Sequence, residues 1–406
     1  MKQEIQSAVE QQLMVTGAYS PLEWLIDSGH VLYPDYVAWR NGDESGSLQS
    51  LSHLSESELL DFLNAAAQFA GKLGLESEVV VLKGWQRDNA QQALFVSRND
   101  QLATLLQQRW CRPEKDVQQF DLFMDNPTLV LENDFLELFF LRRWDDAQKK
   151  LDKIYQCDPG HAKLGSYENL VAYGQHCEQP IVLVGDSCRD DLALIEEELL
   201  GLESEVEPLC ARVLSRSGRD YLAPAWARIG AALEGQEFVP EHPKLHASYA
   251  WQQYHDWGKT QRSIESEPDY LRQPVLLWRL ALAHCYQQRR GPGLALLCLV
   301  LSLDQAFASQ QFEQCPDVRF LSIWQAFQDL EGELPLSDFP GWWLLHDRGV
   351  VAQLKDFSVS GIGLVYAAVS GLLLASAEQD MTTELVFRKR LLECSPGLLK
   401  VYLQDK

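Results

Sequence analysis

The chain has 406 residues, of which 46% are apolar and 23% are charged, and its formal net charge is −23. This composition is typical of a folded protein with an ample core, built as two or three domains or as one long repeat array. The acidic excess argues against binding to a phosphate backbone, because such proteins cluster Lys and Arg, whereas the best basic cluster here spans only residues 388–390. We therefore expect no nucleic-acid partner.

The nine cysteines are scattered without a C-x-x-C pair. This spacing is typical of reduced thiols in a cytoplasm and offers no paired zinc ligands. Residues 1–15 lack an apolar core of signal-peptide length, so we expect a cytoplasmic protein. His242 and His246 have the spacing of two ligands on one helix face, but Pro243 lies between them and no third ligand is indicated. The sequence predicts neither a metal site nor a cofactor.

Helix boundaries dominate the first hundred residues. Ser20 and Ser55 each precede a glutamate by three residues, which predicts a capping box at the start of two helices, and Pro21 suits the first helical position. A short helix between them is predicted over 34–42. The expected helix ends are the glycines Gly29, Gly42 and Gly74.

The hydrophobic period then changes. Residues 78–85 and 92–97 are short and rich in β-branched residues, with a polar segment between them, which predicts a β-hairpin. A polar, proline-containing stretch follows residue 110, and we place a domain boundary there. The sequence thus predicts an N-terminal helical domain with a small hairpin over 1–115 and a second domain over 116–406.

Two segments of the second domain resemble the tetratricopeptide repeat, in which small residues let paired helices cross closely. The second copy departs from the pattern at Arg279 and Phe307, and the copies start 148 residues apart, which is no multiple of the 34-residue period. The matching positions are Ala147, Leu151, Ile154 and Pro159 in the first copy and Leu282, Ala283, Tyr286, Ala295, Leu299 and Ser302 in the second. The expected fold is mainly α, an irregular tetratricopeptide-like superhelix preceded by the N-terminal helical domain.

The resemblance implies a function in binding another protein, as a scaffold or adaptor, through a groove lined by the first helix of each repeat. It places the candidate partner-binding residues His284, Gln287 and Gln288 in that groove and Arg289 and Arg290 at its rim. The identity of the partner and the oligomeric state are left open by the sequence.

An enzyme is the first alternative. Gly185-Asp186-Ser187 at the end of a β-prone run matches the nucleophile motif of a hydrolase family, but the accompanying Asn and His blocks are missing, so we interpret it as a turn that starts a helix. A pocket near 337–349 could combine Asp338 with His346, although packing of its tryptophans between helices is favoured. We expect no catalytic site.

A membrane-tethered adaptor is the second alternative. Residues 358–377 carry no charge and are long enough to cross a bilayer, with Gly363, Ala367, Gly371 and Ala375 at every fourth position. Seven of these twenty residues are Gly or Ser, which makes the segment weakly hydrophobic. We therefore expect a buried helix rather than a membrane span.

Overall fold

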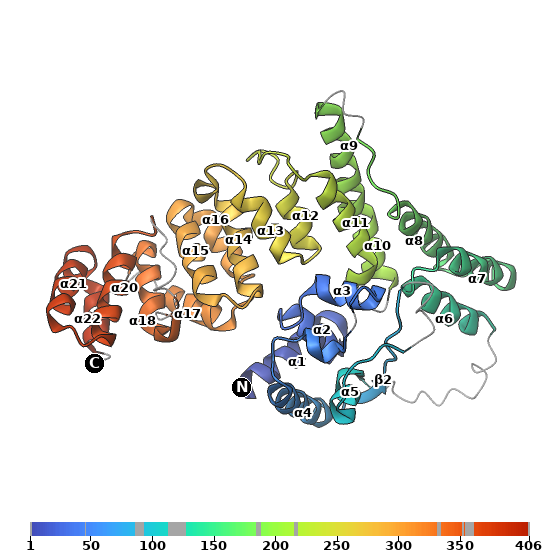
Figure 1. Cartoon of the computed structure of the whole chain (residues 1–406), viewed down its shortest axis with the longest axis horizontal. Coiled ribbons are helices and arrows are strands. Elements are labelled where there is room, and N and C mark those ends of the chain that lie inside the picture. Colours follow the sequence, from blue (N-terminus) through green and yellow to red (C-terminus); the bar gives the residue numbers. More distant parts are fainter. Residues whose placement is uncertain are drawn as a thin grey trace. The chain divides into compact units, whose positions relative to one another are not determined.

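A computed structural model of the chain describes residues 2–44, 46–85, 93–112, 127–183, 188–214, 218–330, 334–350, 353 and 361–404. Helices dominate this structure and strands are few, which confirms the expected mainly α fold (Figure 1). The chain forms two compact units, one of Met1–Gln236 with Gln253–Asp256 and the other of Glu237–Gln252 with Trp257–Lys406. The boundary predicted at residue 115 lies among residues 113–126, outside the described ranges, and stays a prediction.

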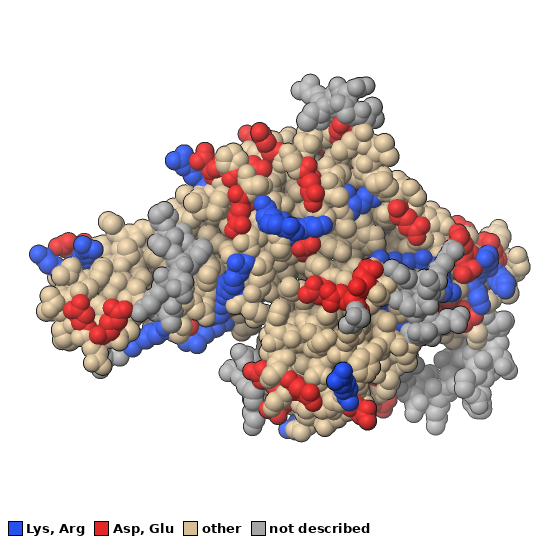
Figure 2. All heavy atoms as spheres, viewed as in Figure 1, with Lys and Arg blue, Asp and Glu red and all other residues tan. Residues whose placement is uncertain are grey.

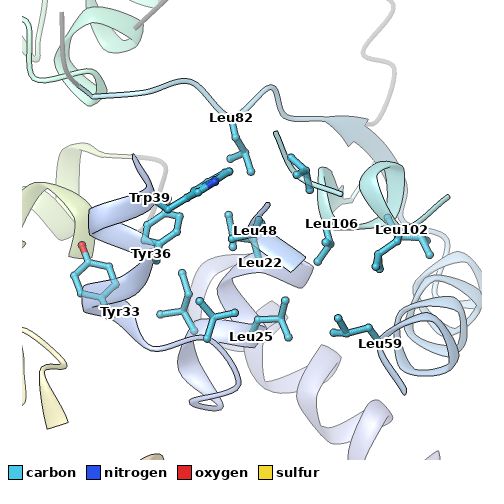
Figure 3. Packing of buried hydrophobic residues seen from close by; sticks show 14 of the residues in the cluster. Leu22, Leu25, Tyr33, Tyr36, Trp39, Leu48, Leu59, Leu82, Leu102 and Leu106 are labelled. Carbon is cyan, nitrogen blue, oxygen red and sulfur yellow. The ribbon is translucent and has the colours of Figure 1, made fainter. Parts of the chain in front are cut away.

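The N-terminal half of the first unit consists of short helices around a small sheet. Its apolar core joins aromatic residues of one helix to leucines of the others (Figure 3). Figure 3 shows Tyr33, Tyr36 and Trp39 on one side of the cluster and Leu59 and Leu102 on the other. The elements are α1 (Lys2–Thr16), β1 (Ala18–Tyr19), α2 (Pro21–Asp27), α3 (Tyr33–Asn41), the 3-10 helix η1 (Leu48–Leu51), α4 (Glu56–Lys72), β2 (Glu76–Val79), α5 (Asp100–Leu106) and β3 (Gln108–Cys111).

The predicted helix ends of this half are confirmed. The side chains of Ser20 and Ser55 accept hydrogen bonds from the backbone N–H of Glu23 and Glu58, and the capping box at Ser55 is complete. Gly29, Gly42 and Gly74 all have positive φ angles of 71 to 81°, which suit glycine because it lacks a Cβ. The capping box predicted at Ser20 was wrong. The N–H of Ser20 donates to the Gln12 side chain (3.0 Å), and the Glu23 carboxylate pairs with Arg219 instead.

The predicted hairpin is confirmed only as an isolated antiparallel bridge, and the start of its first segment pairs with another strand. β2 pairs antiparallel with β3, from Glu76 opposite Cys111 to Val79 opposite Gln108, and the sheet order is β1-β3-β2. In the described part of this region, segments 78–85 and 92–97 approach each other at the bridge between Lys83 and Ala93 and at the bond from Leu94 N–H to the Leu82 carbonyl (2.8 Å). Strand pairing depends on distant segments, so a local pattern could not reveal β3 as the partner.

The second half of the first unit is helical. Its core is aromatic, with Phe139 lying between Trp144 and Tyr221 at centroid distances of 5.4 and 4.9 Å. The elements are α6 (Pro127–Phe140), α7 (Trp144–Cys157), α8 (Leu164–His176), α9 (Cys188–Gly201), the π-helical turn η2 (Leu202–Val206), α10 (Glu207–Val213) and α11 (Arg219–Ala232).

The second unit consists of paired helices joined by short turns, with a core that includes Leu294, Leu297, Phe312 and Trp343. The elements are α12 (Ala247–Gln253), α13 (Trp257–Glu265), η3 (Tyr270–Arg272), α14 (Pro274–Tyr286), α15 (Arg290–Leu303), α16 (Gln305–Phe312), α17 (Val318–Gln328), η4 (Leu336–Asp338), α18 (Phe339–His346), η5 (Arg348–Val350), α20 (Leu364–Ala377), α21 (Met381–Cys394) and α22 (Pro396–Gln404).

One turn geometry recurs between paired helices. The pairs α6/α7, α14/α15 and α20/α21 are each joined by three residues, and the middle residue has a positive φ of 56, 61 or 58° at Arg142, Gln288 and Gln379. In each turn the N–H of the third residue donates to the carbonyl five residues earlier, at 2.9 to 3.0 Å. This hydrogen bond and the left-handed residue define a Schellman motif. The α12/α13 pair has the same left-handed middle residue, His255, 33 residues before Gln288.

Candidate functional site

The five predicted partner-binding residues lie at the α14–α15 turn, but in different environments. His284 is buried, with 5% of its surface exposed, and Gln287 is partly buried. Gln288 and Arg289 are exposed, and Arg289 bonds to Gln261 and Gln287. Burial removes His284 from the surface, so within this set Gln288 and Arg289 are the residues most open to a partner.

Arg290 has a structural role. Its guanidinium pairs with Asp317, which caps α17 by accepting from the N–H of Phe320 (2.8 Å). It also pairs with Asp347 (2.6 Å), whose side chain is 1% exposed and lies 3.2 Å from Arg319. Two acids therefore hold Arg290 at the start of α15 and connect this helix to α17 and to the end of α18.

The segment 337–349 is dominated by packing. Trp343 and Phe339 are fully buried beside Phe320, with ring centroids 6.1 and 5.5 Å from it. Asp338 accepts a hydrogen bond from the Ser395 hydroxyl (2.6 Å), and burial raises the pKa of this carboxyl. His346 is exposed and lies against the Trp342 ring. Asp338 and His346 thus have separate partners.

Of the uncharged segment 358–377, residues 361–377 are described. Helix α20 packs against α18 and α21 and buries Tyr366, Val369 and Leu372, as a buried helix should. Across the described ranges, no helix is long and apolar enough to cross a membrane. Residues 184–187 are not described, so the turn hypothesis for Ser187 stays a prediction.

A serine, a histidine and an acid meet at the start of α12, a cluster that the sequence analysis missed. His246 Nδ1 lies 2.8 Å from the Ser248 hydroxyl, and its Nε2 lies 3.4 Å from Glu267. Arg279, the departure from the repeat pattern, donates to the same hydroxyl (3.0 Å) and to the Pro243 carbonyl (2.8 Å). Burial, with the charge of Arg279, lowers the pKa of His246 to about 4.

The serine, histidine and acid are connected in the order of a catalytic triad, but their surroundings do not allow catalysis. Ser248 is completely buried and already accepts from a guanidinium, so no substrate carbonyl can reach its oxygen. His246 also accepts from the N–H of Ser248 (3.3 Å), as a residue capping α12 does. The cluster therefore joins α12 to α14. In the described part of the chain, no three His, Cys, Asp or Glu side chains are arranged to hold a metal ion.

The first unit contains a pocket of about 400 Å³ between α2, α3, β3 and the start of α11. Arg219 on α11 pairs with Glu23 and Asp27 on α2. Burial alone would lower the pKa of Arg219, but these two acids outweigh it and raise the pKa. The neighbouring Asp220 accepts hydrogen bonds from the hydroxyls of Tyr33 (2.9 Å) and Tyr36 (3.3 Å).

Arg40 differs from Arg219 in its partners. Its Nη1 donates to the Tyr36 hydroxyl (2.7 Å), and its guanidinium lies 4.6 Å from the Trp85 ring centroid. No carboxylate of the described ranges pairs with it. Arg142 also lies over the Trp85 ring (4.1 Å), so two cations share one indole. Sequence reasoning missed this pocket because its residues come from segments as far apart as Gln12 and His255, 243 positions along the chain.

The surface of α21 carries an apolar stripe, defined here as Met381, Leu385 and Leu392. Each of these side chains is more than half exposed. They lie within about 40° of one another around the helix, since an α-helix turns about 100° per residue. Lys389 is exposed at the edge of the stripe and has no acidic partner in the described part of the chain.

The chain matches no protein family, and no curated protein or solved structure is significantly similar to it.

Proposed function

We propose that this protein is a non-catalytic adaptor whose second unit, a tetratricopeptide-like array of helix pairs, binds another protein. The recurring Schellman turns at Gln288 and Gln379 and the left-handed His255 support the repeat interpretation. The step of 33 residues from His255 to Gln288 is close to the family's 34-residue period. In this proposal Gln288 lies in the partner-binding groove and Arg289 at its rim, as the resemblance implies, and both side chains are exposed.

The apolar stripe of α21 is the observation that carries the proposal. Three large apolar side chains in one line on an exposed helix face form a patch of the kind that marks a binding surface. The partner that this stripe fits is an amphipathic helix whose apolar residues cover Met381, Leu385 and Leu392. An acidic residue at the edge of that helix would pair with Lys389.

A protein partner agrees better with the surface than a nucleic acid does. Lys and Arg side chains are interspersed with Asp and Glu on the face shown in Figure 2. A reducing compartment, the cytoplasm, is part of the proposal because the described cysteines are free thiols.

Photo-crosslinking from the surface of the full-length protein in its host tests this function. A photoreactive amino acid replaces Leu385 in one variant and Val318 on α17 in the control, since both side chains are 59% exposed. We expect a discrete crosslinked protein from position 385 and none from position 318. The crosslink should also disappear when Leu392→Glu is added. Equal crosslinking from both positions, or none from 385, would contradict the proposal.

A further inference from the structure

The pocket of the first unit has the size of a small-molecule site, because such sites usually measure about 300–1,000 Å³. We propose that it binds a small zwitterion that carries an apolar group, of which an apolar α-amino acid is the simplest example. This site lies in the first unit and is independent of the partner-binding stripe of α21.

The charge of the pocket wall points to a ligand without net charge. Three acids (Glu23, Asp27 and Asp220) and three arginines (Arg40, Arg109 and Arg219) line it. His255 adds no charge at neutral pH, because burial lowers its pKa to about 4. A phosphate or a polyamine would meet as many like charges as opposite ones. A zwitterion can instead place its positive group near the acids of the wall and its negative group near the arginines.

Arg40 supplies the position for the ligand's carboxylate. The other two arginines of the wall have acidic partners: Arg219 pairs with Glu23 and Asp27, and Arg109 with Glu78 (3.2 Å). Arg40 has none in the described part of the chain, and its contacts with Tyr36 and Trp85 hold it in place. A guanidinium that is already oriented binds a carboxylate through paired hydrogen bonds, without loss of further side-chain freedom.

Asp220 supplies the position for the ligand's ammonium group. The Tyr36 hydroxyl lies between the two charges, 2.7 Å from Arg40 Nη1 and 3.3 Å from Asp220 Oδ2. The cation and the anion of the wall are therefore one phenol oxygen apart. This separation suits a ligand whose own charges are close together, as they are in an α-amino acid.

The remainder of the pocket wall is apolar and can bury an apolar side chain of the ligand. Its residues are Leu22, Val80, Leu82, Leu106 and Phe140, and Figure 3 shows Leu22 and Leu82 between Tyr36 and Leu106. Burial of an aliphatic or aromatic group against these residues would supply the apolar part of the binding free energy.

Titration calorimetry of the full-length protein tests the proposal with L-leucine, L-methionine and L-phenylalanine. We expect at least one to bind with one molecule per chain. Leucinamide, which lacks the carboxylate, and N-acetyl-leucine, which lacks the ammonium, should bind about tenfold more weakly or worse, because each loses charge-assisted hydrogen bonds. No binding of the amino acids at about 10 mM, or equal binding of the blocked compounds, would overturn the proposal.

Variants locate the binding. Val80→Trp fills the apolar part of the pocket and should abolish binding, whereas Val81→Trp, one residue away at a side chain outside the pocket wall, should not. Arg40→Gln should weaken binding of the amino acid about tenfold or more. The variant should then bind leucine and leucinamide with equal affinity, because it can no longer recognise the carboxylate. If Arg40→Gln does not fold, Val80→Trp alone tests whether the amino acid binds in this pocket. Unchanged binding by Val80→Trp would show that the ligand occupies another site.

Discussion

Gly293 on α15 lies against Cys285 on α14 with no room for a side chain. A Cβ at residue 293 would lie 2.6 Å from Cys285 Sγ and 2.9 Å from the backbone oxygen of Ala281. Cβ atoms of real proteins essentially never lie within 3.0 Å of such a neighbour, and a backbone oxygen inside a helix cannot move aside cheaply. The α14/α15 crossing is therefore set by the absence of a side chain at this position.

Replacing Gly293 by alanine should lower stability by about 1–3 kcal/mol, because the added methyl group overpacks the crossing. Helix propensity alone predicts the opposite, a gain of about 1 kcal/mol. Urea unfolding measures the difference. Gly71→Ala on α4 is the control, since a Cβ there would meet nothing within 4 Å. A stabilised Gly293→Ala variant would mean that the two helices are further apart.

Ala295→Leu should also destabilise the second unit by about 1–3 kcal/mol, because Ala295 is fully buried on the same helix. The matched control is Ala367→Leu on α20, where the alanine is exposed and the same change should have little effect. Thermal melting of the two variants provides the comparison. If both melt alike, residue 295 is not in a packed interior.

Arg290→Leu should destabilise the protein by about 3–5 kcal/mol, because it removes a partner of the buried Asp347. Arg289→Leu, at the adjacent exposed position, should change stability by less than about 1 kcal/mol. Urea unfolding of the two variants distinguishes a structural arginine from a surface one. If Arg290→Leu loses no more stability than Arg289→Leu, Arg290 is not needed to neutralise Asp347.

Acid should destabilise the protein between about pH 6.5 and pH 4. Burial lowers the pKa values of His246, His255 and His284 to about 4, with further lowering from Arg279, Arg219 and Arg289, respectively. In this pH range these histidines bind protons in the unfolded chain but stay neutral in the folded chain. Their contribution to stability is therefore fully present above the histidine pKa of the unfolded chain. As the pH falls below that value, the free energy of unfolding decreases by about 1.4 kcal/mol per pH unit for each histidine.

Chemical unfolding between pH 7 and pH 4.5 measures this slope. His284→Gln removes the contribution of one histidine and should therefore reduce the slope by up to about 1.4 kcal/mol per pH unit. Gln310→Asn, at an exposed residue without a titrating group, is the control and should leave the slope unchanged. An unaltered slope in His284→Gln would mean that residue 284 is accessible to protons in the folded state.

The sequence by itself determined the helical content and several helix ends. Ser20, Ser55, Gly42 and Gly74 act on backbone groups within a few residues, so their roles can be read locally. The apolar spacing of Ala147, Leu151 and Ile154 likewise predicted a buried helix face, and all three are buried.

Only the tertiary structure decided which distant groups meet. It paired β2 with β3, buried His284, and gave Arg290 two acids that lie 27 and 57 residues further along the chain. It also placed Arg40 and Asp220 on either side of the Tyr36 hydroxyl. Local hydrogen bonds and apolar periods specify helices, whereas ion pairs, strand pairing and pockets depend on how those helices pack, which no short stretch of sequence encodes.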